Sequence, residues 1–486
     1  MKSEIEPREG RGFSSAGCGR KLSWRGVLLG LLLAAGLSGA VRTLEAAPAD
    51  PPLNFILILV DDLGWTDLSC MGSGFYETPN IDRLADEGVR FTDAYSACTV
   101  CSPTRAAVLT GKAPARLHLT DWIEGHKRPG AKLRVPDWTM HLRHEEVTIP
   151  EVLKHAGYVS ASIGKWHLGG EEYGPTSQGF DRNVAGYHRG QPPSYFSPYR
   201  IPTLEDGPEG EYLTDRECGE ALKFIEENRD RPFFLYLAHY AVHTPLQAKR
   251  ELVGKYEAKD AGDQPHGNPV YAAMIESVDR SVGRLVSRLD ELEISERTVI
   301  LFTSDNGGLI GNPRRPVTSN EPLRAGKGSA YEGGVRVPLI IKWPGVVVGG
   351  TVLAEPVISM DFLPTLAAMA GVEGEVPGAL DGRSLVPLLN QSGDLDRDAL
   401  YWHYPHYHPG GATPHGAVRM GDFKLIEFYE DGRRELYNLK DDSGETKDLS
   451  SLLPDKAAQM AVQLKSWREV VDAQMPAPNP DYDPER

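Results

Sequence analysis

The stretch Phe55-Ile-Leu-Ile-Leu-Val60 is uniformly apolar, and Asp61-Asp62 follows it without a spacer. A short apolar run that stops at charged residues is typical of a strand buried on both faces, as in parallel sheets. Longer helical patterns, such as residues 270–292, alternate with such runs. Three later runs have the same form, at residues 159–163, 233–237 and 298–303. The sequence therefore predicts an α/β fold built on a mostly parallel sheet.

Ligand-type side chains follow all four apolar runs. They are Asp61 and Asp62, then Lys165 and His167, then His239 and His243, and finally Asp305 and Asn306. Sites in open α/β sheets form at the carboxyl ends of the strands. We therefore expect these distant segments to assemble one active site. His239 has no obvious carboxylate partner in the sequence, and we assign it a structural role.

The composition is that of a globular protein with an acidic balance. The 486 residues are 40% hydrophobic and 25% charged, with a formal net charge of −16 at pH 7. This charge argues against nucleic acid as a partner. Binding an anionic substrate would require basic groups or a metal ion that reverse the sign of the local field.

Residues 1–49 have the form of a secretory signal peptide. Arg20, Lys21 and Arg25 lead into the apolar run of residues 26–41, and Ala47-Pro-Ala49 offers small residues for cleavage. The alternative is an uncleaved membrane anchor, but the run is shorter than the ~20 residues of a spanning helix. We expect a secreted or periplasmic protein without stable membrane insertion once the signal is removed.

The pattern changes near residue 390. Short aromatic segments with turn signals, at residues 399–404, 423–428 and 435–439, precede a helical pattern at residues 456–475. They predict a small antiparallel sheet with a helix packed on it. We expect a catalytic domain at residues 50–390 and a C-terminal subdomain at residues 391–486. The Pro-rich tail from Pro476 onward is expected to be disordered.

The cysteines do not form a disulfide framework. They are dispersed at Cys18, Cys70, Cys98, Cys101 and Cys218, and Cys18 lies in the expected signal peptide. If Cys101 is reserved for chemistry, at most one bridge remains among Cys70, Cys98 and Cys218. Which pair would form it stays open.

Cys101 opens the pentapeptide Cys101-Ser-Pro-Thr-Arg105. Pro103 fits the first turn of a helix that ends near Gly111, which places Cys101 at or just before the helix N-terminus. Unpaired backbone N–H groups and the positive end of the helix dipole favour anions there. Arg105, one turn along, adds a planar group suited to oxyanions. The alternative is an ordinary buried cysteine at a capped helix.

The pentapeptide resembles the sulfatase signature, in which a maturation enzyme oxidises the cysteine of an exported chain to formylglycine (3-oxoalanine). Further motifs match this family in its order: Asp61-Asp-Leu-Gly-Trp65, Thr78-Pro-Asn-Ile-Asp82, Gly164-Lys-Trp-His-Leu-Gly169, His243-Thr-Pro245, Ser304-Asp-Asn-Gly307 and residues 326–336. One departure is Lys112, where family members often have arginine.

The resemblance is to formylglycine-dependent sulfatases of the alkaline phosphatase superfamily, including secreted bacterial polysaccharide sulfatases and arylsulfatases. It implies an alkaline-phosphatase-like α/β/α sandwich with a large mixed, mostly parallel sheet, plus a smaller C-terminal antiparallel sheet and helix. It also implies hydrolysis of sulfate esters with release of inorganic sulfate.

Four of the predicted site residues are candidate metal ligands. Asp61, Asp62, Asp305 and Asn306 offer hard oxygen atoms from two strand ends, which suit Ca²⁺ or Mg²⁺ better than zinc. Taken alone, Asp61-Asp62 has the alternative of capping a helix or turn. The resemblance implies calcium as the cofactor and adds the modified side chain of Cys101 to the ligand set.

The resemblance also implies catalytic roles. Hydrated formylglycine at position 101 would attack sulfur, activated by the metal and Asp305. His243 and Lys327 would protonate or stabilise the leaving oxygen. His167 would then remove a proton from the remaining hydroxyl, so that sulfate is expelled.

Arg105 and Lys165 would hold the formylglycine and sulfate oxygens with fixed positive charge. A basic residue taken alone is more often solvated or structural than catalytic. Lys165 and His167 gain support from Gly164 and Gly169, which free the backbone to approach a ligand.

Two stretches are candidate rims of a substrate cleft. Tyr401-Trp-His-Tyr-Pro-His-Tyr-His408, with His415 beyond it, has a composition suited to sugar rings. Residues 122–144 carry His126, Lys127, Arg128, Arg143 and His144, which suit an anionic glycan. Both stretches have the alternative of being solvated surface. The expected secretion and the aromatic stretch favour a sulfated carbohydrate over a small aryl ester as substrate.

Two other functions fit parts of the pattern. A phosphomonoester or phosphonate hydrolase of the same superfamily would share the geometry and a metal-assisted displacement. A non-catalytic sulfated-glycan-binding protein would need neither a nucleophile nor proton-transfer groups. Cys101, His167 and His243 argue against this second alternative.

Overall fold

The central sheet is built around β1 (Asn54–Val60), the apolar strand that precedes Asp61-Asp62. The computed structural model describes residues 51–262, 265–312 and 314–483, so the expected signal peptide lies outside the described residues. The sheet has the order β12 (Thr351–Leu353), β2 (Val89–Phe91), β11 (Leu339–Lys342), β8 (Thr298–Ser304), β1, β7 (Phe233–His239), β5 (Val159–Gly164) and β6 (Arg182–Val184). β1 pairs in parallel with β7 and β8, whereas β11 runs antiparallel to β8 and β2. The predicted mixed, mostly parallel sheet is confirmed.

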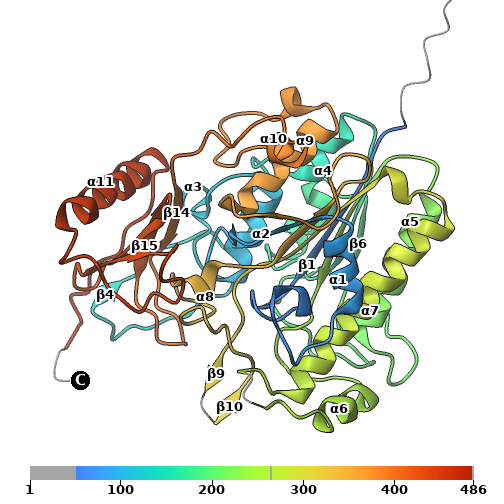
Figure 1. Ribbon diagram of the computed structural model, residues 1–486, viewed down its shortest axis with the longest axis horizontal. Helices are drawn as coiled ribbons and strands as arrows, with labels where there is room; N and C mark the ends of the chain where they lie inside the picture. The colour runs from blue at the N-terminus through green and yellow to red at the C-terminus, as the bar shows by residue number, and fades with distance from the viewer. Residues whose placement is uncertain (1–50, 263–264, 313, 484–486) are drawn as a thin grey trace, which may run out of the picture. The chain divides into compact units, whose positions relative to one another are not determined.

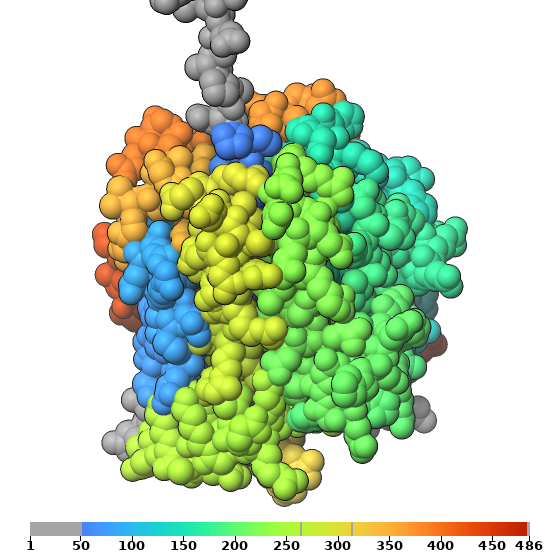
Figure 2. Space-filling model, turned by 90° about the vertical axis from the view of Figure 1, so that its right-hand side faces the viewer, coloured from blue at the N-terminus to red at the C-terminus, as the bar shows by residue number. Residues whose placement is uncertain are grey.

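Helices cover both faces of this sheet (Figure 1). Ile56, Ile58 and Val60 of β1 share one hydrophobic core with α1 (Pro79–Asp86), α5 (Leu213–Glu227) and α7 (Pro269–Glu291). Phe55, Leu57 and Leu59 share another with α2 (Cys101–Thr110), α4 (Ile149–Lys154) and α9 (Phe362–Met369). Alternate side chains of a strand point to opposite faces, so β1 is apolar throughout because both faces are covered. Figure 2 shows the first helical layer, with α7 in yellow between α1 in blue and α5 in green.

Shorter elements connect these layers. The other helices outside the C-terminal part are α3 (Pro114–Leu117), α6 (Arg250–Glu257), α8 (Glu332–Val335) and α10 (Val386–Leu389). The short strands are β3 (Ala94–Tyr95), β4 (Leu133–Arg134), β9 (Gly311–Asn312), β10 (Arg315–Pro316) and β13 (Val357–Ile358). Single 3₁₀ turns lie at η1 (Ser69–Met71), η2 (Glu171–Tyr173), η3 (Pro175–Gln178), η4 (Ser295–Arg297), η5 (Ser359–Asp361) and η6 (Glu373–Glu375).

The C-terminal part forms the predicted antiparallel sheet with a helix. Its strands are β14 (Leu400–Tyr404), β15 (His415–Met420), β16 (Phe423–Phe428) and β17 (Arg434–Asn438), paired in that order. Val418, Leu425 and Leu436 pack against Met460 and Leu464 of α11 (Pro454–Val470). The boundary predicted at residue 390 stays a prediction.

This sheet also packs against the segment that leads into α2. The Trp402 indole stacks edge-on against Tyr95 with ring centroids 5.3 Å apart, and its Nε1 donates to the Ser96 carbonyl at 2.9 Å. The C-terminal sheet is therefore held close to the N-terminus of the helix that carries Cys101.

The Pro-rich tail is held in place at its start. Ala477–Pro478 (β18) pairs antiparallel with β4, and Asn479 Nδ2 donates to the carbonyls of Pro129 and Ala131 at 2.8 and 2.7 Å. The prediction of disorder from Pro476 onward is therefore wrong for these residues. Specific hydrogen bonds to a distant segment order them, and composition does not signal such bonds.

Two sequence-level alternatives concern cysteines and membrane spans. Cys70, Cys98, Cys101 and Cys218 all carry free thiols, so the described part of the chain contains no disulfide. Within the same part, no helix has both the length and the apolar character that crossing a bilayer requires.

Candidate active site

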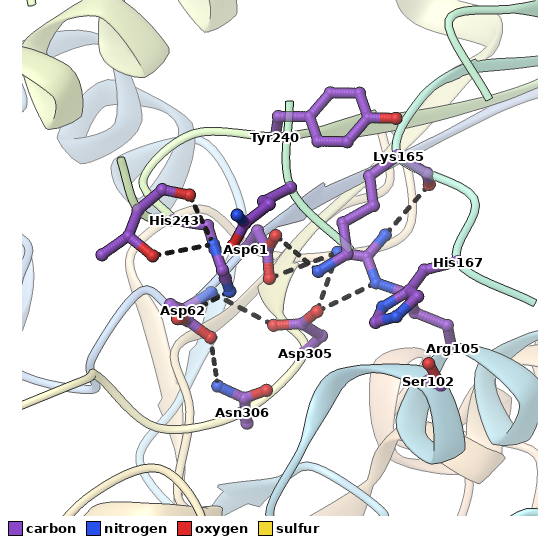
Figure 3. Close-up of polar contacts among 12 residues, drawn as sticks. Asp61, Asp62, Ser102, Arg105, Lys165, His167, Tyr240, His243, Asp305 and Asn306 are labelled. Atoms are coloured by element: carbon purple, nitrogen blue, oxygen red, sulfur yellow. Dashed lines mark hydrogen bonds and ion pairs between the residues drawn. The ribbon is translucent and has the colours of Figure 1, made fainter. Parts of the chain in front are cut away.

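The predicted site residues meet at the carboxyl edge of the sheet (Figure 3). Val60 lies opposite both His239 of β7 and Ser304 of β8, so the segments after these strands emerge side by side. These segments carry Asp61, Asp62, His243, Asp305 and Asn306, while Lys165 and His167 follow β5. α2 adds Cys101 and Arg105, and the loop before α8 adds Lys327. Each of these ten residues contacts another member of the group or lines the same cleft.

Cys101 is the first residue of α2, as the sequence predicts. The helix ends at Thr110, and Gly111 takes the left-handed conformation (φ 66°) that terminates it. The Cys101 side chain is buried, and burial raises the pKa of its thiol. Since the thiolate is the nucleophilic form of cysteine, the unmodified side chain is poorly suited to attack at neutral pH.

Arg105 is committed to the cluster of carboxylates. Its Nε and Nη2 donate to Asp305 Oδ2 at 2.9 and 2.7 Å, and its Nη1 donates to the Lys165 carbonyl at 3.1 Å. The Arg105 and Asp305 side chains have no exposed surface. A guanidinium group that donates two hydrogen bonds to one carboxylate oxygen fixes the orientation of that carboxylate. Arg105 thus fixes the orientation of Asp305, a role that the sequence did not predict.

Two lysines pair with the aspartates that follow β1. Lys165 Nζ lies 2.6 Å from Asp61 Oδ2, and Lys327 Nζ lies 2.7 and 2.9 Å from the two oxygens of Asp62. Burial alone would raise the pKa of Asp62, but Lys327, His243 and Lys165 outweigh it and hold this pKa well below its usual range. For Asp61, burial and the charge of Asp305 prevail over Lys165 and raise the pKa. The negative charge at Asp61 therefore remains under-compensated by the protein's own cations.

The oxygen atoms of this cluster fit a hard metal ion. Ligand atoms of Asp61, Asp62, Cys101 and His243 lie within 4.8 Å of one another. Asp61 Oδ1 and Asn306 Oδ1 are buried and have no hydrogen-bond partner among the described residues. Buried polar atoms are rarely left unpaired, and carboxylate and amide oxygens are the donors that Ca²⁺ or Mg²⁺ takes. A cation would also offset the charge that raises the pKa of Asp61.

The two histidines of the site are held by backbone carbonyls. His167 has a left-handed backbone (φ 58°), which is uncommon for a residue with a side chain, and its Nε2 contacts the Ile123 carbonyl. Burial and Lys165 hold the pKa of His167 well below its usual range. His243 Nδ1 contacts the Thr244 carbonyl at 2.8 Å, and burial with Lys327 lowers its pKa to about 3. Both rings are therefore neutral near pH 7.

Lys327, beside Asp62 and His243, is protonated and can donate a proton or a hydrogen bond. Burial would lower its pKa, but Asp62 outweighs burial and raises the pKa above the usual range. Since neutral His243 uses its Nδ1 proton for the Thr244 carbonyl, its Nε2 faces Asp62 Oδ2 at 3.6 Å as an acceptor. Lys327 is the better placed of the two predicted donors.

A cleft of about 1260 Å³ opens over the cluster. Cys101, His167, His243 and Lys327 line it at the catalytic end, and Phe428 with Arg433 lines it beside the C-terminal sheet. The volume exceeds the roughly 300–1,000 Å³ of ordinary small-molecule pockets. The cleft can therefore admit more than the ester group itself.

Only part of the His-rich stretch reaches this cleft. His408 and His415 line it, whereas His403 and His406 are buried behind it. His403 is hydrogen-bonded to Tyr429 Oη at 2.8 Å, and His406 to Thr120 Oγ1 at 2.8 Å. These partners lie inside the C-terminal packing, so the proposed substrate contact does not extend to His403 or His406.

The rim predicted at residues 122–144 also needs correction. Residues 122–125 line the cleft, but the cationic residues beyond them are absent from its lining among the described residues. Arg128 stacks on Tyr407 at 5.3 Å, Arg143 pairs with Glu146 at 3.2 Å, and His144 stacks on Tyr173 at 4.8 Å. Nearby partners engage these charges and rings, so they do not form a cationic wall for the substrate.

Several features of the site carry no clear signal in the sequence. Residues 188–191 form a wall of the cleft. Next to them, the backbone N–H of His167 donates to the Tyr187 carbonyl at 3.1 Å. Ile123 contributes only its backbone carbonyl to the contact with His167 Nε2, so the residue type at position 123 does not mark it. Lys112, the departure from the family motif, pairs with Glu146 at 2.7 Å.

His239 has a carboxylate partner after all. Its Nδ1 lies 2.6 Å from Glu217 Oε2, and its Nε2 lies 3.0 Å from Ser281 Oγ. All three side chains are buried, and none lines the cleft. The expected structural role for His239 stays a prediction, with Glu217 now identified as its partner.

Comparisons with known proteins agree with this arrangement. The sulfatase family model matches residues 53–372, and the model for the C-terminal region of N-sulphoglucosamine sulphohydrolase matches residues 326–473. The chain is 34% identical to a sulfatase of Formosa agariphila, over 91% of this chain and 92% of that protein. It is 35% identical to human N-acetylgalactosamine-6-sulfatase, over 74% of this chain and 69% of that protein.

Solved structures share the fold. Ps i-CgsB aligns with a TM-score of 0.72 and 31% identity, over 89% of this chain and 94% of that chain. A phosphonate monoester hydrolase of Agrobacterium radiobacter aligns with a TM-score of 0.63 and 21% identity, over 86% and 96% of the two chains. Fold and site together define a hydrolase with an alkaline-phosphatase-like α/β/α architecture. Within that class the chain belongs to the sulfatase family and is a sulfuric ester hydrolase.

Proposed function

We propose that this enzyme removes sulfate from sulfated carbohydrates, with formylglycine formed from Cys101 as nucleophile and calcium as cofactor. The observation that carries the proposal is the position of Cys101, which begins α2 beside the carboxylates and lysines at the end of β1. The relatives support the substrate class. One is a human N-acetylgalactosamine-6-sulfatase, and Ps i-CgsB is known in complex with k-i-k-neocarrahexaose.

The calcium ion would be held by Asp61, Asp62, Asp305, Asn306 and the modified side chain at position 101. Bound calcium would supply positive charge for sulfate oxygens, and hydrated formylglycine would supply a hydroxyl nucleophile. Among the protein's own groups, Arg105 keeps Asp305 oriented.

Proton transfer and charge stabilisation fall to the basic residues. Lys165 and Lys327 offer fixed positive charge beside the ester, where water is largely excluded. Lys327 gives a proton or a hydrogen bond to the leaving oxygen, with His243 next to it. His167, neutral near pH 7, accepts a proton when sulfate is released.

The proposal also covers the path that yields the mature enzyme. The signal peptide at residues 1–49 would direct export to the periplasm or outside the cell. A formylglycine-generating enzyme would act on the Cys101 motif. The mature chain would contain the catalytic domain at residues 50–390 and the C-terminal subdomain from residue 391, whose sheet contributes to the cleft.

The alternative of phosphate-ester chemistry is tested by a paired assay. Matured protein is expected to hydrolyse 4-nitrophenyl sulfate with kcat/KM at least about 100-fold above that for 4-nitrophenyl phosphate. That ratio corresponds to about 2.7 kcal/mol of transition-state discrimination. The leaving group is the same in both esters, so the ratio reports on the transferred group alone. A preference for the phosphate ester would contradict the proposed function.

Removing the metal is expected to lower activity and stability together. Chelation should abolish most turnover and lower Tm, because an ion present at 100 times its Kd stabilises a native protein by about 2.7 kcal/mol. Calcium should restore both quantities when added back. Differential scanning calorimetry and a sulfate-release assay measure the effects.

A matched pair of variants locates the metal effect. Asn306→Ala removes a candidate ligand and should reduce the Tm difference between chelated and calcium-loaded protein. Asn390→Ala alters an exposed asparagine and should leave that difference unchanged. If chelation affects neither activity nor Tm, the metal proposal is wrong.

Charge in the cleft predicts a preference for anionic glycans. Arg189, Lys327 and Arg433 line the cleft, and Glu124 is the one acidic residue among its described lining, in contrast to the net charge of −16 for the chain. Arg189 is exposed, and no ion pair engages it among the described residues. Arg189→Ala is expected to raise KM for a polysulfated oligosaccharide about 5- to 10-fold, or about 1–1.4 kcal/mol. Turnover of 4-nitrophenyl sulfate should not change.

The control for this prediction is Arg182→Ala. Arg182 is a partly exposed arginine paired with Glu227 at 2.5 Å, and it does not line the cleft. It should leave both substrates unaffected. An equal change in KM for the oligosaccharide and the aryl sulfate would show that Arg189 does not bind further sulfate groups of the oligosaccharide.

A further inference from the structure

The segment of residues 121–125, here named the cleft strap, connects the nucleophile helix to His167. The backbone N–H of Ile123 donates to Ser102 Oγ at 3.2 Å, and the backbone carbonyl of Ile123 contacts His167 Nε2. Ser102 directly follows Cys101 and is fully buried; its hydroxyl is labelled below His167 in Figure 3. One residue of the strap therefore touches both the start of α2 and the predicted base.

The strap determines which nitrogen of His167 carries the proton. A carbonyl oxygen only accepts hydrogen bonds, so Nε2 is the donor in this contact. A neutral imidazole has a single N–H, which leaves the lone pair on Nδ1. Nδ1 is buried and has no hydrogen-bond partner among the described residues. No hydrogen bond among the described residues therefore uses the lone pair of Nδ1.

Gly190 also limits the space around the ring of His167. Gly190 packs against it so closely that a Cβ at that position would lie 2.4 Å from the ring carbon Cε1. In the other neutral tautomer, the unprotonated Nε2 would face the Ile123 carbonyl oxygen. That arrangement would set two acceptors against each other.

The side chain of Asp121, the first residue of the strap, fixes the position of the residues that follow it. Asp121 Oδ1 accepts hydrogen bonds from the backbone N–H of Trp122 and from Tyr404 Oη, each at 2.9 Å. The Asp121 side chain has no exposed surface, and Tyr404 belongs to β14 of the C-terminal sheet. The next residue back, Thr120, is hydrogen-bonded to His406 at 2.8 Å. The position of the strap is therefore set by buried polar groups outside the cleft.

We infer that Asp121 is a positioning residue, which acts through the strap to hold His167 as the Nε2–H tautomer and so makes Nδ1 the proton-accepting atom. The role of His167 as a base rests on the proposed function, whereas its tautomer rests on the contacts alone. In the proposed release step, the O–H bond of the remaining hydroxyl at position 101 breaks and its proton goes to Nδ1, while Nε2 keeps its own. The electron pair of that O–H bond forms the C=O of formylglycine as the C–O bond to sulfate breaks, and sulfate leaves. The ring gains one positive charge, and a charged donor strengthens its bond to the Ile123 carbonyl.

Histidine-selective ¹⁵N NMR of the mature, metal-loaded enzyme tests the tautomer directly. Signals of His167 are assigned as those missing from His167→Gln. We expect a protonated Nε2 and an unprotonated Nδ1 in the wild type. The opposite pattern in the wild type would overturn the inference. Because the spectrum is read without substrate, an enzyme with no sulfatase activity would refute the proposed function but leave the tautomer measurable.

Substitutions at Asp121 test the positioning role. Asp121→Ala is expected to give His167 signals of mixed tautomers and to lower kcat by about 10- to 100-fold, since small misplacement of a catalytic group has effects of that size. KM should change less than twofold. Asp121→Asn keeps an acceptor oxygen for Trp122 and Tyr404 and should restore most of kcat and the single tautomer.

Tyr429→Phe is the matched control. It removes a buried hydroxyl that is hydrogen-bonded to His403 at 2.8 Å, in the same subdomain but without contact to the strap. It should alter neither the His167 signals nor kcat. If Asp121→Ala lowers Tm but keeps wild-type signals and kcat, Asp121 is only structural. If that variant does not fold, Tyr404→Phe removes one donor to Asp121 and should shift both readouts in the same direction.

Discussion

A Cys101→Ala variant is expected to lose sulfatase activity by at least about 10⁴-fold, because it removes the precursor of the nucleophile while leaving the surrounding charges in place. The side chain is small and buried at the first residue of α2, so the loss of its sulfur should cost only about 1 kcal/mol of stability. Activity and stability should therefore separate clearly. Steady-state kinetics and urea unfolding measure the two quantities.

The mass of the peptide containing residue 101 provides the matching observation on the wild type. Conversion of cysteine to formylglycine replaces SH₂ by oxygen and makes the peptide about 18 Da lighter. Active wild-type enzyme should contain the lighter form. Full activity in protein whose residue 101 is only a free thiol would contradict the proposed mechanism, and so would an active Cys101→Ala variant.

An Arg105→Ala variant is expected to lose about 3–5 kcal/mol of stability together with nearly all activity. Arg105 and Asp305 are both fully buried, and removing one partner of a buried ion pair leaves an uncompensated charge. Asp305 would lose two hydrogen bonds to the same oxygen, and with them the orientation that the arginine fixes. Arg105→Lys keeps the charge but not the fork, so it should preserve more stability than activity. Urea unfolding and kcat/KM distinguish these outcomes.

A double variant and a partly buried ion pair outside the site serve as controls. Combining Arg105→Ala with Asp305→Asn should cost less stability than the sum of the single changes, because no orphaned charge remains. Arg116 and Asp381 form a similar paired contact at 2.7 Å, with the arginine side chain 28% exposed and outside the cleft lining. Arg116→Ala should cost about 1 kcal/mol or less and leave activity intact. Wild-type stability in Arg105→Ala would refute the account of this buried pair.

The central sheet and the core of the site could be predicted because their signals are local in sequence. Each central strand is a short apolar run, and each run stops at the side chains that form the site. Parallel strands bring their carboxyl ends to one edge, so the sequence predicts that Asp62 and Asp305 lie at the same edge although 243 residues separate them. Pro103 and Gly111 likewise marked the limits of α2.

The walls of the cleft could not be predicted in the same way. Whether a histidine of the stretch 401–408 reaches the cleft depends on what packs around the β14 sheet, and composition gives no such information. Arg128 and Arg143 carry the charge expected of a rim, yet Tyr407 and Glu146 engage them elsewhere. The Ile123 carbonyl is a backbone atom, and every residue has one. Specificity features of this kind depend on tertiary contacts between segments far apart in the chain.

The pairing of β18 with β4 joins a segment that is synthesised early to one that is synthesised last. A ribosome completes residues 133–134 more than three hundred residues before their partners at 477–478 exist. Until then, the segment that leads away from the cleft strap has no strand to pair with, although α2 and the first strands are already available. The late arrival of this partner makes the pairing of residues 133–134 one of the last contacts that a newly made chain can form.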